Sequence, residues 1–379
     1  MKIKSKKALI TIGVVILGFT GAILLLNNWD KGFFAANQNN TASISSMIET
    51  YTTDKRDVKL TIGVLKADEI NYKLYGYNGK ELTPVEYEYE IGSISKTFTA
   101  SMLSKAIADG HINLNDSISK YLSLESNTFY PDILSLATHT SGYGEYPFDS
   151  STLSDEELNM VNENFYEKKQ NIYQGINAAD ILEDIQLHVL KEESYGWEYS
   201  NFGYAVLGTV LGDVYSTTFK SLSENYIKND LGLMKTRLGN GTGDMNSYWA
   251  WNDDDTYFAA AGIVSTVTDL LKYGEMHLND SPNYLALSHE VYETFEDDGI
   301  SMGLGWIIDP ESGYIWHNGG TSSYTSFLGI DKEHKTVVVI LSNYPEKDDT
   351  KDDGAVDILG YTLLNSLGNE DRNVFNVLE

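Results

Sequence analysis

Ser93 and Lys96 stand three positions apart in a chain of 379 residues. Positions i and i+3 of a helix share a face, so the Ser93 hydroxyl and the Lys96 amine can meet there. A serine hydroxyl is a poor nucleophile until an adjacent base takes its proton. An amine held in a dry pocket at a helix N-terminus is pushed toward its neutral form and can supply that base. The spacing therefore indicates nucleophilic catalysis, although a solvated helix start produces the same pattern by chance.

Two later segments carry residue types that would complete such a site. Tyr199-Ser200-Asn201 offers a phenol as a second acid or base, beside an amide that can hold a polar group. The segment 317–320 follows an expected strand, and its glycines let the backbone approach a substrate and aim N–H groups at a developing oxyanion. Each segment alone has an ordinary explanation, as a turn or as a structural histidine. Together they give the candidate catalytic residues Ser93, Lys96 and Tyr199, and the candidate substrate-binding or oxyanion residues Asn201, His317, Asn318, Gly319 and Gly320.

Hydrophobic periodicity predicts the elements that must position these residues. Apolar residues recur at helical spacing after Ser93, from Phe98 to Ile107, and Gly110 stands where that helix would end. Further helices are expected at Ile44–Tyr51, Phe202–Val214 and Gly354–Leu367. Alternating segments predict a hairpin of strands at Lys59–Leu65 and Ile70–Gly76, and later strands at 314–316, 325–330 and 336–341.

Strand-rich sequence at both ends encloses helix-rich sequence in the middle. This order predicts an α+β fold in which one antiparallel sheet is built from both chain ends and flanked by helices. The folded domain would span residues 44–379, with a mostly helical subdomain inserted at about 105–200. Within it, Gly142–Glu198 is expected to be an elaborated loop near a cleft where the two parts meet, which is a usual place for a small-molecule site.

Residues 1–31 differ from the rest of the chain. Four lysines among the first seven residues precede an uncharged run from Ala8 to Leu26. As a helix this run would be roughly 28 Å long, close to the hydrocarbon thickness of a bilayer. It is longer than a usual signal-peptide core and no convincing cleavage site follows, so we expect a basic cytoplasmic tail and an uncleaved transmembrane anchor rather than a removed signal. The positive-inside rule then places everything after Asn27 outside the cell, with 32–43 as a tether.

Composition excludes several classes of function. Residues 1–31 carry five lysines and one aspartate, so the net charge of −28 leaves −32 for the remaining chain. Such a surface repels nucleic acid, which excludes it as a partner. The acidity is either a generic solvated exterior or the sign of a cleft that favours cationic substrate groups. The chain has no cysteine, which excludes disulfides, thiol catalysis and cysteine-ligated metals. The oligomeric state stays open.

With these motifs in place, the chain resembles the serine β-lactamase-related hydrolases, in the branch of class C β-lactamases, DD-peptidases and penicillin-binding-protein-like esterases. The likeness extends beyond the three site motifs to Leu136–Tyr143, Ala260–Leu270 and Gly303–Trp306, and it covers about residues 44–368. It implies the β-lactamase/transpeptidase-like fold and a serine hydrolase that requires no cofactor and no metal.

The resemblance also implies a role for each site residue. Ser93 would attack a carbonyl carbon and form an acyl-enzyme. Lys96 and Tyr199 would share the proton transfers, with neighbouring positive charge keeping Tyr199 acidic enough to act as a base. Asn201 would hold either the substrate's amide or the Lys96 amine. The backbone N–H groups of Ser93 and Gly320 would form the oxyanion hole, and water would release the acyl group.

One departure from the family pattern bears on the substrate. Many members carry Lys-Thr-Gly where this chain has His317-Asn318-Gly319. A mostly neutral imidazole binds the carboxylate of a penicillin or of a terminal D-alanine poorly. His-x-Gly versions resemble the family's esterases, D-aminopeptidases and D-alanyl esterases. We therefore expect a membrane-anchored, outward-facing hydrolase of D-amino-acid-containing cell-envelope material. A DD-peptidase, a self-resistance peptidase, a β-lactamase or a catalytically silent penicillin-binding-like sensor are the alternatives.

Overall fold

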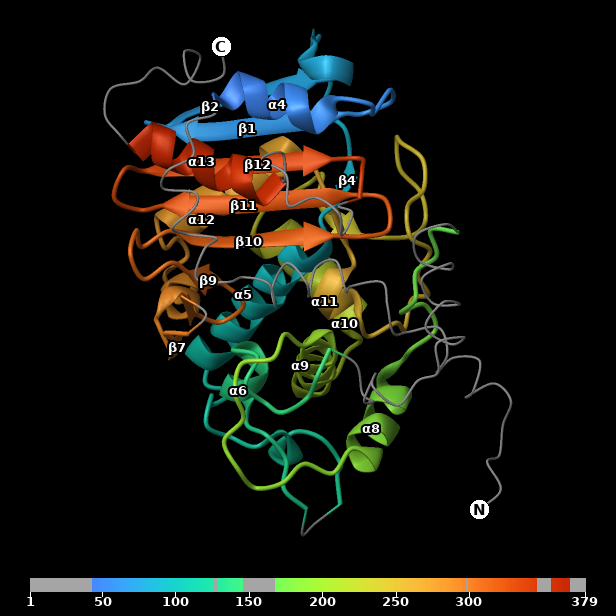
Figure 1. Ribbon diagram of the computed structural model, residues 1–379. Coiled ribbons are helices and arrows are strands. Elements are labelled where there is room, and N and C mark those ends of the chain that lie inside the picture. Colours follow the sequence, from blue (N-terminus) through green and yellow to red (C-terminus); the bar gives the residue numbers. More distant parts are fainter. Residues whose placement is uncertain (1–42, 126–127, 146–167, 298, 346–355, 369–379) are drawn as a thin grey trace.

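A nine-stranded antiparallel sheet joins the two ends of the described chain (Figure 1). The computed structural model describes residues 43–125, 128–145, 168–297, 299–345 and 356–368. The strand order is β3-β2-β1-β12-β11-β10-β9-β8-β7. The strands are β1 Leu60–Lys66, β2 Glu69–Tyr75, β3 Glu81–Leu82, β7 Glu293–Phe295, β8 Ile300–Met302, β9 Ile307–Ile308, β10 Ile315–Gly320, β11 Thr325–Asp331 and β12 Thr336–Ser342. Because β1 pairs with β12, the prediction of one sheet built from both chain ends is confirmed.

The predicted N-terminal hairpin is present and ends in a two-residue turn. Lys66 pairs with Glu69, which leaves only Ala67 and Asp68 between the strands. Their φ angles are +51° and +64°. Two consecutive left-handed residues are the hairpin turn whose twist matches that of the flanking strands. The register of β1 against β2 is therefore set locally.

Helices cover both faces of this sheet. The helices α4 (Ile44–Thr52) and α13 (Val356–Gly368) pack on one face, and α12 (Val267–Leu278) packs on the other (Figure 1). Glycines set how closely they approach: a Cβ on Gly274 would meet Val337, and one on Gly360 would meet Phe327. Both faces of the central strands are thus buried, which explains the almost unbroken apolar run of β12.

The middle of the chain supplies further helices and a small second sheet. The helices are α5 Ser95–Ala108, α6 Ile133–Ala137, α8 Ala178–Leu187, α9 Asn201–Val214, α10 Phe219–Asn225 and α11 Phe258–Ala261. A three-stranded sheet has the order β4-β6-β5, with β4 Tyr89–Glu90, β5 Arg237–Leu238 and β6 Ile263–Ser265. Short helical turns are η1 Tyr77–Gly79, η2 Gly92–Ile94, η3 Ile118–Lys120, η6 Tyr226–Asp230 and η7 Asn283–His289. The expected loop at 142–198 contains the helix α8, which Asn177 and Asp180 begin with a capping box.

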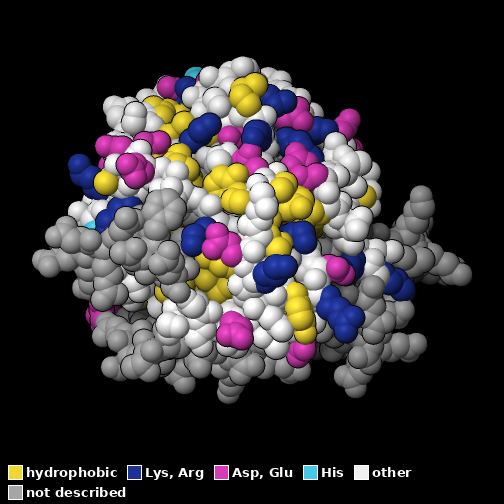
Figure 2. All heavy atoms as spheres, turned by 90° about the horizontal axis from the view of Figure 1, so that it is seen from above, with side chains coloured by type: hydrophobic (Ala, Val, Ile, Leu, Met, Phe, Trp, Pro, Cys, Tyr) yellow, Lys and Arg dark blue, Asp and Glu magenta, His cyan; other side chains and the backbone are white. Residues whose placement is uncertain are grey.

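The expected anchor at 8–26 lies outside the described residues, as do residues 146–167 of the loop region. Over the residues that the structure describes, no helix has both the length and the apolar composition for a membrane span. On the face seen from above in Figure 2, basic and acidic side chains are interspersed. The acidic excess of the chain is therefore not gathered into a single patch on that face.

Candidate active site

A tight turn brings Ser93 to the start of α5. The turn is the 3-10 helix η2, Gly92–Ile94, which leads directly into the α-helix. Gly92 has a φ of +49°, a left-handed conformation that favours glycine. A Cβ on Gly92 would also lie 2.5 Å from the backbone nitrogen of Gly320. Glycine before Ser93 thus makes the turn and lets β10 approach it.

Ser93 and Lys96 lie together inside the protein. The Lys96 Nζ lies 3.1 Å from the Ser93 Oγ, 2.5 Å from Asn201 Oδ1 and 3.0 Å from the carbonyl oxygen of Ala260. Lys96 is 0% exposed. This burial lowers the pKa of Lys96 well below the ordinary lysine value, although the nearby Glu145 carboxylate opposes the shift. The amine is therefore driven toward its neutral form.

The hydrogen-bond partners of the Lys96 amine determine the direction of its lone pair when the amine is neutral. A neutral amine has two N–H donors and one lone pair. The oxygens of Asn201 and Ala260 can only accept, so they take the two N–H groups. The protonated ammonium donates to Ser93 Oγ, whereas in the neutral amine the lone pair remains for the Ser93 hydroxyl to donate to. This is the arrangement of a nucleophile with its base.

Tyr199 is 5% exposed and hydrogen-bonds the Ser93 side chain. Its ring centroid lies 4.7 Å from Lys96 Nζ. The expectation that positive charge keeps Tyr199 acidic is wrong. Burial raises the pKa of Tyr199, and Glu145 adds to the rise, which the hydrogen bond with Ser93 only partly offsets. Tyr199 is therefore a neutral phenol that can donate or relay a proton, and it is not the resting base.

Asn201 is the first residue of α9, and the hydroxyl of Ser200 caps this helix. The Asn201 amide nitrogen donates to Glu145 Oε1 at 3.2 Å and to the Tyr173 hydroxyl at 3.0 Å. These two bonds fix which end of the amide is oxygen, and that oxygen accepts from Lys96. Of the two roles expected for Asn201, the structure shows the one that holds the Lys96 amine.

The strand β10 directs His317 and Asn318 to opposite sides. His317 is 1% exposed, and burial together with Lys96 lowers its pKa to about 3, so its imidazole is neutral. Asn318 points the other way, and its amide nitrogen donates to Asp357 Oδ2 of α13 at 2.7 Å. Strand alternation thus turns the Asn318 side chain toward α13, and a part for Asn318 in substrate binding stays a prediction.

The end of β10 lies against the turn that carries Ser93. A Cβ on Gly319 would collide with the carbonyl oxygen of Ile91 and lie 2.8 Å from the backbone nitrogen of Ser93. Together with the contact between Gly92 and Gly320, this places the expected oxyanion donors, the N–H groups of Ser93 and Gly320, on adjacent backbone segments. Only glycine permits this approach.

Sequence reasoning did not assign three residues that complete the site. Glu145 and Tyr173 fix the amide of Asn201, and His139 packs on Tyr199 with ring centroids 4.6 Å apart. Glu145 follows the segment 136–143 by two residues, so that motif was an available signal for it. No pattern marks Tyr173, because only the tertiary fold brings it to Asn201.

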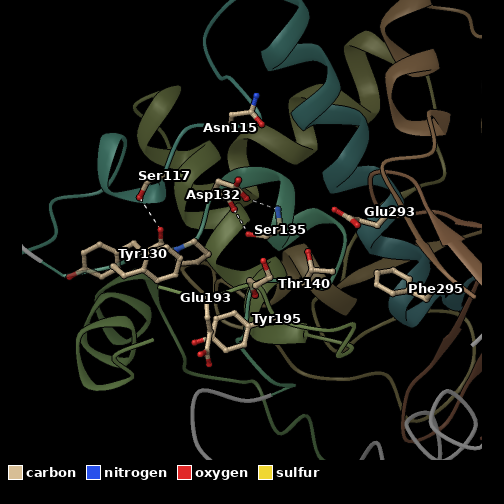
Figure 3. Close-up of a pocket in the computed structure, with 14 residues that line it drawn as sticks. Asn115, Ser117, Tyr130, Asp132, Ser135, Thr140, Glu193, Tyr195, Glu293 and Phe295 are labelled. Carbon is tan, nitrogen blue, oxygen red and sulfur yellow. Dashed lines mark hydrogen bonds between the residues drawn. The ribbon is translucent and has the colours of Figure 1, made fainter. Parts of the chain in front are cut away.

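Figure 3 shows a separate pocket of about 500 Å³. Rings and carboxylates surround it, among them Tyr130, Tyr195, Phe295, Asp132, Glu193 and Glu293. None of the eight candidate site residues lines this pocket. It approaches the site through Phe295, whose ring centroid lies 6.5 Å from that of Trp197, two residues before Tyr199.

Comparisons with known proteins agree with this fold. A β-lactamase of Pseudomonas fluorescens is 26% identical over 288 residues, covering 70% of this chain and 74% of the relative. Protein flp of Staphylococcus aureus (strain COL) is 22% identical over 339 residues, 81% of this chain, which spans only 64% of that relative's length. The solved D-stereospecific amidohydrolase of a Streptomyces species has a TM-score of 0.62 and 19% identity, with 82% of this chain and 96% of that one covered.

An antiparallel sheet flanked by helices, with a buried lysine beside a serine at a helix start, defines a serine hydrolase of the β-lactamase fold. The family model described as Beta-lactamase matches residues 45–361. The chain belongs to the β-lactamase family.

Proposed function

We propose that this protein hydrolyses esters or amides of D-amino acids in cell-envelope material, through an acyl-enzyme on Ser93. The charge of the site carries this proposal. Glu145 is 7% exposed and acts electrostatically on both Lys96 and Tyr199, while His317 is neutral. A substrate that enters with a free ammonium group beside its carbonyl meets a carboxylate and, within the part of the site that the structure describes, no opposing cation.

The same charges disfavour a substrate that carries a carboxylate. Among the described residues, Lys96 is the only buried lysine or arginine, and burial drives it toward its neutral form. A neutral lysine gives an anionic substrate group no favourable charge pair. The Streptomyces protein with a similar solved structure is a D-stereospecific amidohydrolase. This similarity supports the proposal that the substrate contains a D-amino acid.

The catalytic cycle follows from the contacts. The Lys96 lone pair takes the Ser93 proton as Oγ bonds to the carbonyl carbon, and the N–H groups of Ser93 and Gly320 stabilise the oxyanion. Tyr199 hands a proton to the departing oxygen or nitrogen and regains one from the Lys96 ammonium. The carbon–leaving-group bond then breaks. Water attacks the acyl-enzyme by the same route, and the acid leaves with Ser93 restored.

A β-lactamase is the second candidate, because the Pseudomonas relative bears that name. A panel of D-alanyl esters, D-alanyl-D-alanine peptides and a chromogenic cephalosporin separates the candidates. We expect turnover of the D-alanyl ester and no turnover of the cephalosporin. Efficient cephalosporin hydrolysis, or a clear preference for substrates with a free carboxylate, would contradict the proposal.

Changing Glu145 to glutamine tests the role of charge within this panel. The amide keeps an oxygen that can accept from Asn201, so the loss is mainly that of the negative charge. We expect KM for a D-alanyl ester to rise about tenfold. This factor corresponds to a coupling energy near the lower end of those measured for close charge pairs. KM for the N-acetylated ester, which has no ammonium, should stay within about twofold, since that substrate gains nothing from the charge. Equal changes for both esters would show that Glu145 does not recognise the ammonium.

We also propose that residues 1–31 anchor the protein with its catalytic domain outside the cell. The uncharged run from Ala8 to Leu26 behind a lysine cluster supports this. The full-length chain should sediment with membranes and resist an alkaline carbonate wash, and protease added to intact cells should remove the catalytic domain. A mature protein whose mass lacks these residues would show instead that they form a cleaved signal.

A further inference from the structure

Glu90 is a buried carboxylate that the proposed reaction does not use. It lies in β4, three residues before Ser93, and is 3% exposed. Its Oε1 accepts from the backbone N–H of Trp249 at 2.5 Å, and its Oε2 accepts from the Thr321 hydroxyl at 2.7 Å. Thr321 directly follows Gly320. One carboxylate therefore connects the two chain segments that carry the oxyanion donors.

Neighbouring contacts close this connection into a ring. The indole N–H of Trp249 donates to the Ser322 hydroxyl at 2.7 Å. The Thr321 oxygen that donates to Glu90 also accepts from the N–H of Tyr324 at 3.2 Å. Trp249, Thr321 and Ser322 are each less than 5% exposed. A buried polar ring in which every member is bonded holds its segments rigidly.

We propose that Glu90 is a positioning residue for the oxyanion hole, whose side chain sets the separation between the N–H groups of Ser93 and Gly320. The proposal rests on the Ser93 acyl-enzyme proposed above. Oxyanion donors act only when they lie about 2.7–3.1 Å from the developing charge. A misplacement of about 1 Å can cost roughly 100-fold in rate. A side chain that bonds to Thr321 while its own backbone leads into the Ser93 turn is placed to prevent such a shift.

The positioning role of Glu90 should depend on whether its carboxyl group is ionised. Burial raises the pKa of Glu90 to about 7, while the bonds from Trp249 and Thr321 and the charge of Arg237 on β5 oppose the rise. The Tyr324 phenol also interacts with it electrostatically. Below that pKa one oxygen carries a proton and becomes a donor, so the bonds from Trp249 and Thr321 lose the strength that the carboxylate charge gives them. The oxyanion hole should therefore loosen as the pH falls through about 7.

Glu90→Gln tests the proposal, because glutamine matches the size of glutamate but has one accepting oxygen. At pH 8 we expect kcat to fall about 30-fold, less than the loss of a whole oxyanion donor, with KM unchanged within about twofold. The rate of labelling by a fluorophosphonate and the affinity for a boronic acid, which mimics the tetrahedral state, should fall by a similar factor. Glu88→Gln is the matched control: it removes a charge two residues away that pairs with Arg237 and should change none of these values.

Thr321→Val probes the other end of the same contact and keeps the side-chain shape. It should reproduce the kcat effect, and the double variant Glu90→Gln with Thr321→Val should be no slower than the slower single variant. Folded variants with unchanged kcat and boronic acid affinity overturn the proposal, as does a loss confined to KM. If Glu90→Gln does not fold, Thr321→Val alone decides in the same way. Absence of labelling in the wild-type protein would overturn the acyl-enzyme itself and this proposal with it.

Discussion

Replacing Ser93 with alanine removes turnover of every ester and amide substrate. Removal of the nucleophile from a serine hydrolase lowers kcat by a factor on the order of 10⁶, because all partners act through that one oxygen. We expect a loss of this size for the best substrate of the panel. Intact-protein mass spectrometry should show an acyl adduct on the wild-type chain, located on the peptide that contains Ser93, and no adduct on the variant.

Ser104→Ala is a matched control on the same helix. Ser104 is 0% exposed, and its hydroxyl has no hydrogen-bond partner among the residues described. Its removal takes away a buried oxygen of α5 without removing a bond, so labelling and kcat should match those of the wild type. An acyl adduct on a residue other than Ser93, or retained turnover in Ser93→Ala at similar stability, would contradict the assignment of the nucleophile.

The sequence predicted best what local rules control. The hairpin at 60–75 follows from alternation and a two-residue turn, and α5 follows from apolar spacing that ends near Gly110, whose φ is +76°. The contact between Ser93 and Lys96 is also controlled locally, because one short turn and the helix after it position both residues. The sheet order could be inferred because strand patterns at both ends of the chain had to be buried somewhere.

The features that the sequence left wrong or unassigned depend on tertiary surroundings. The acidity of Tyr199 was inferred from a charge that burial removes: Lys96 is driven toward neutrality by the same desolvation that raises the pKa of Tyr199. The direction of Asn318 depends on the register of β10 and on α13 being placed against it, and neither is visible in a four-residue motif. Glu145 and Tyr173 reach Asn201 from 56 and 28 positions away, and only Glu145 lies near a recognisable motif.

Replacing Lys96 with methionine should be the second most damaging change. Methionine has a similar length and no proton-accepting nitrogen, so Ser93 loses its base. General-base catalysis is typically worth 10²–10⁴-fold, and we expect kcat/KM to fall by about 10³–10⁴.

In the wild type, kcat/KM should rise with pH through the lowered pKa of Lys96, because only the neutral amine accepts a proton. His317, with a pKa of about 3, should add no further change of kcat/KM with pH above pH 5. The Tyr199→Phe variant should still show the rise of kcat/KM with pH, and it should lose less activity than Lys96→Met.

A stability measurement separates lost chemistry from lost structure in Lys96→Met. The folded-state pKa of Lys96 lies below its ordinary value, so between those two values the unfolded chain binds more protons than the folded one. The free energy of unfolding of the wild type, measured relative to the methionine variant, should therefore increase as the pH rises from 7 toward 10. Urea titrations of both proteins at several pH values check the sign. A difference that is independent of pH, or activity that survives in the variant, would mean that Lys96 is protonated throughout and that another group takes the Ser93 proton.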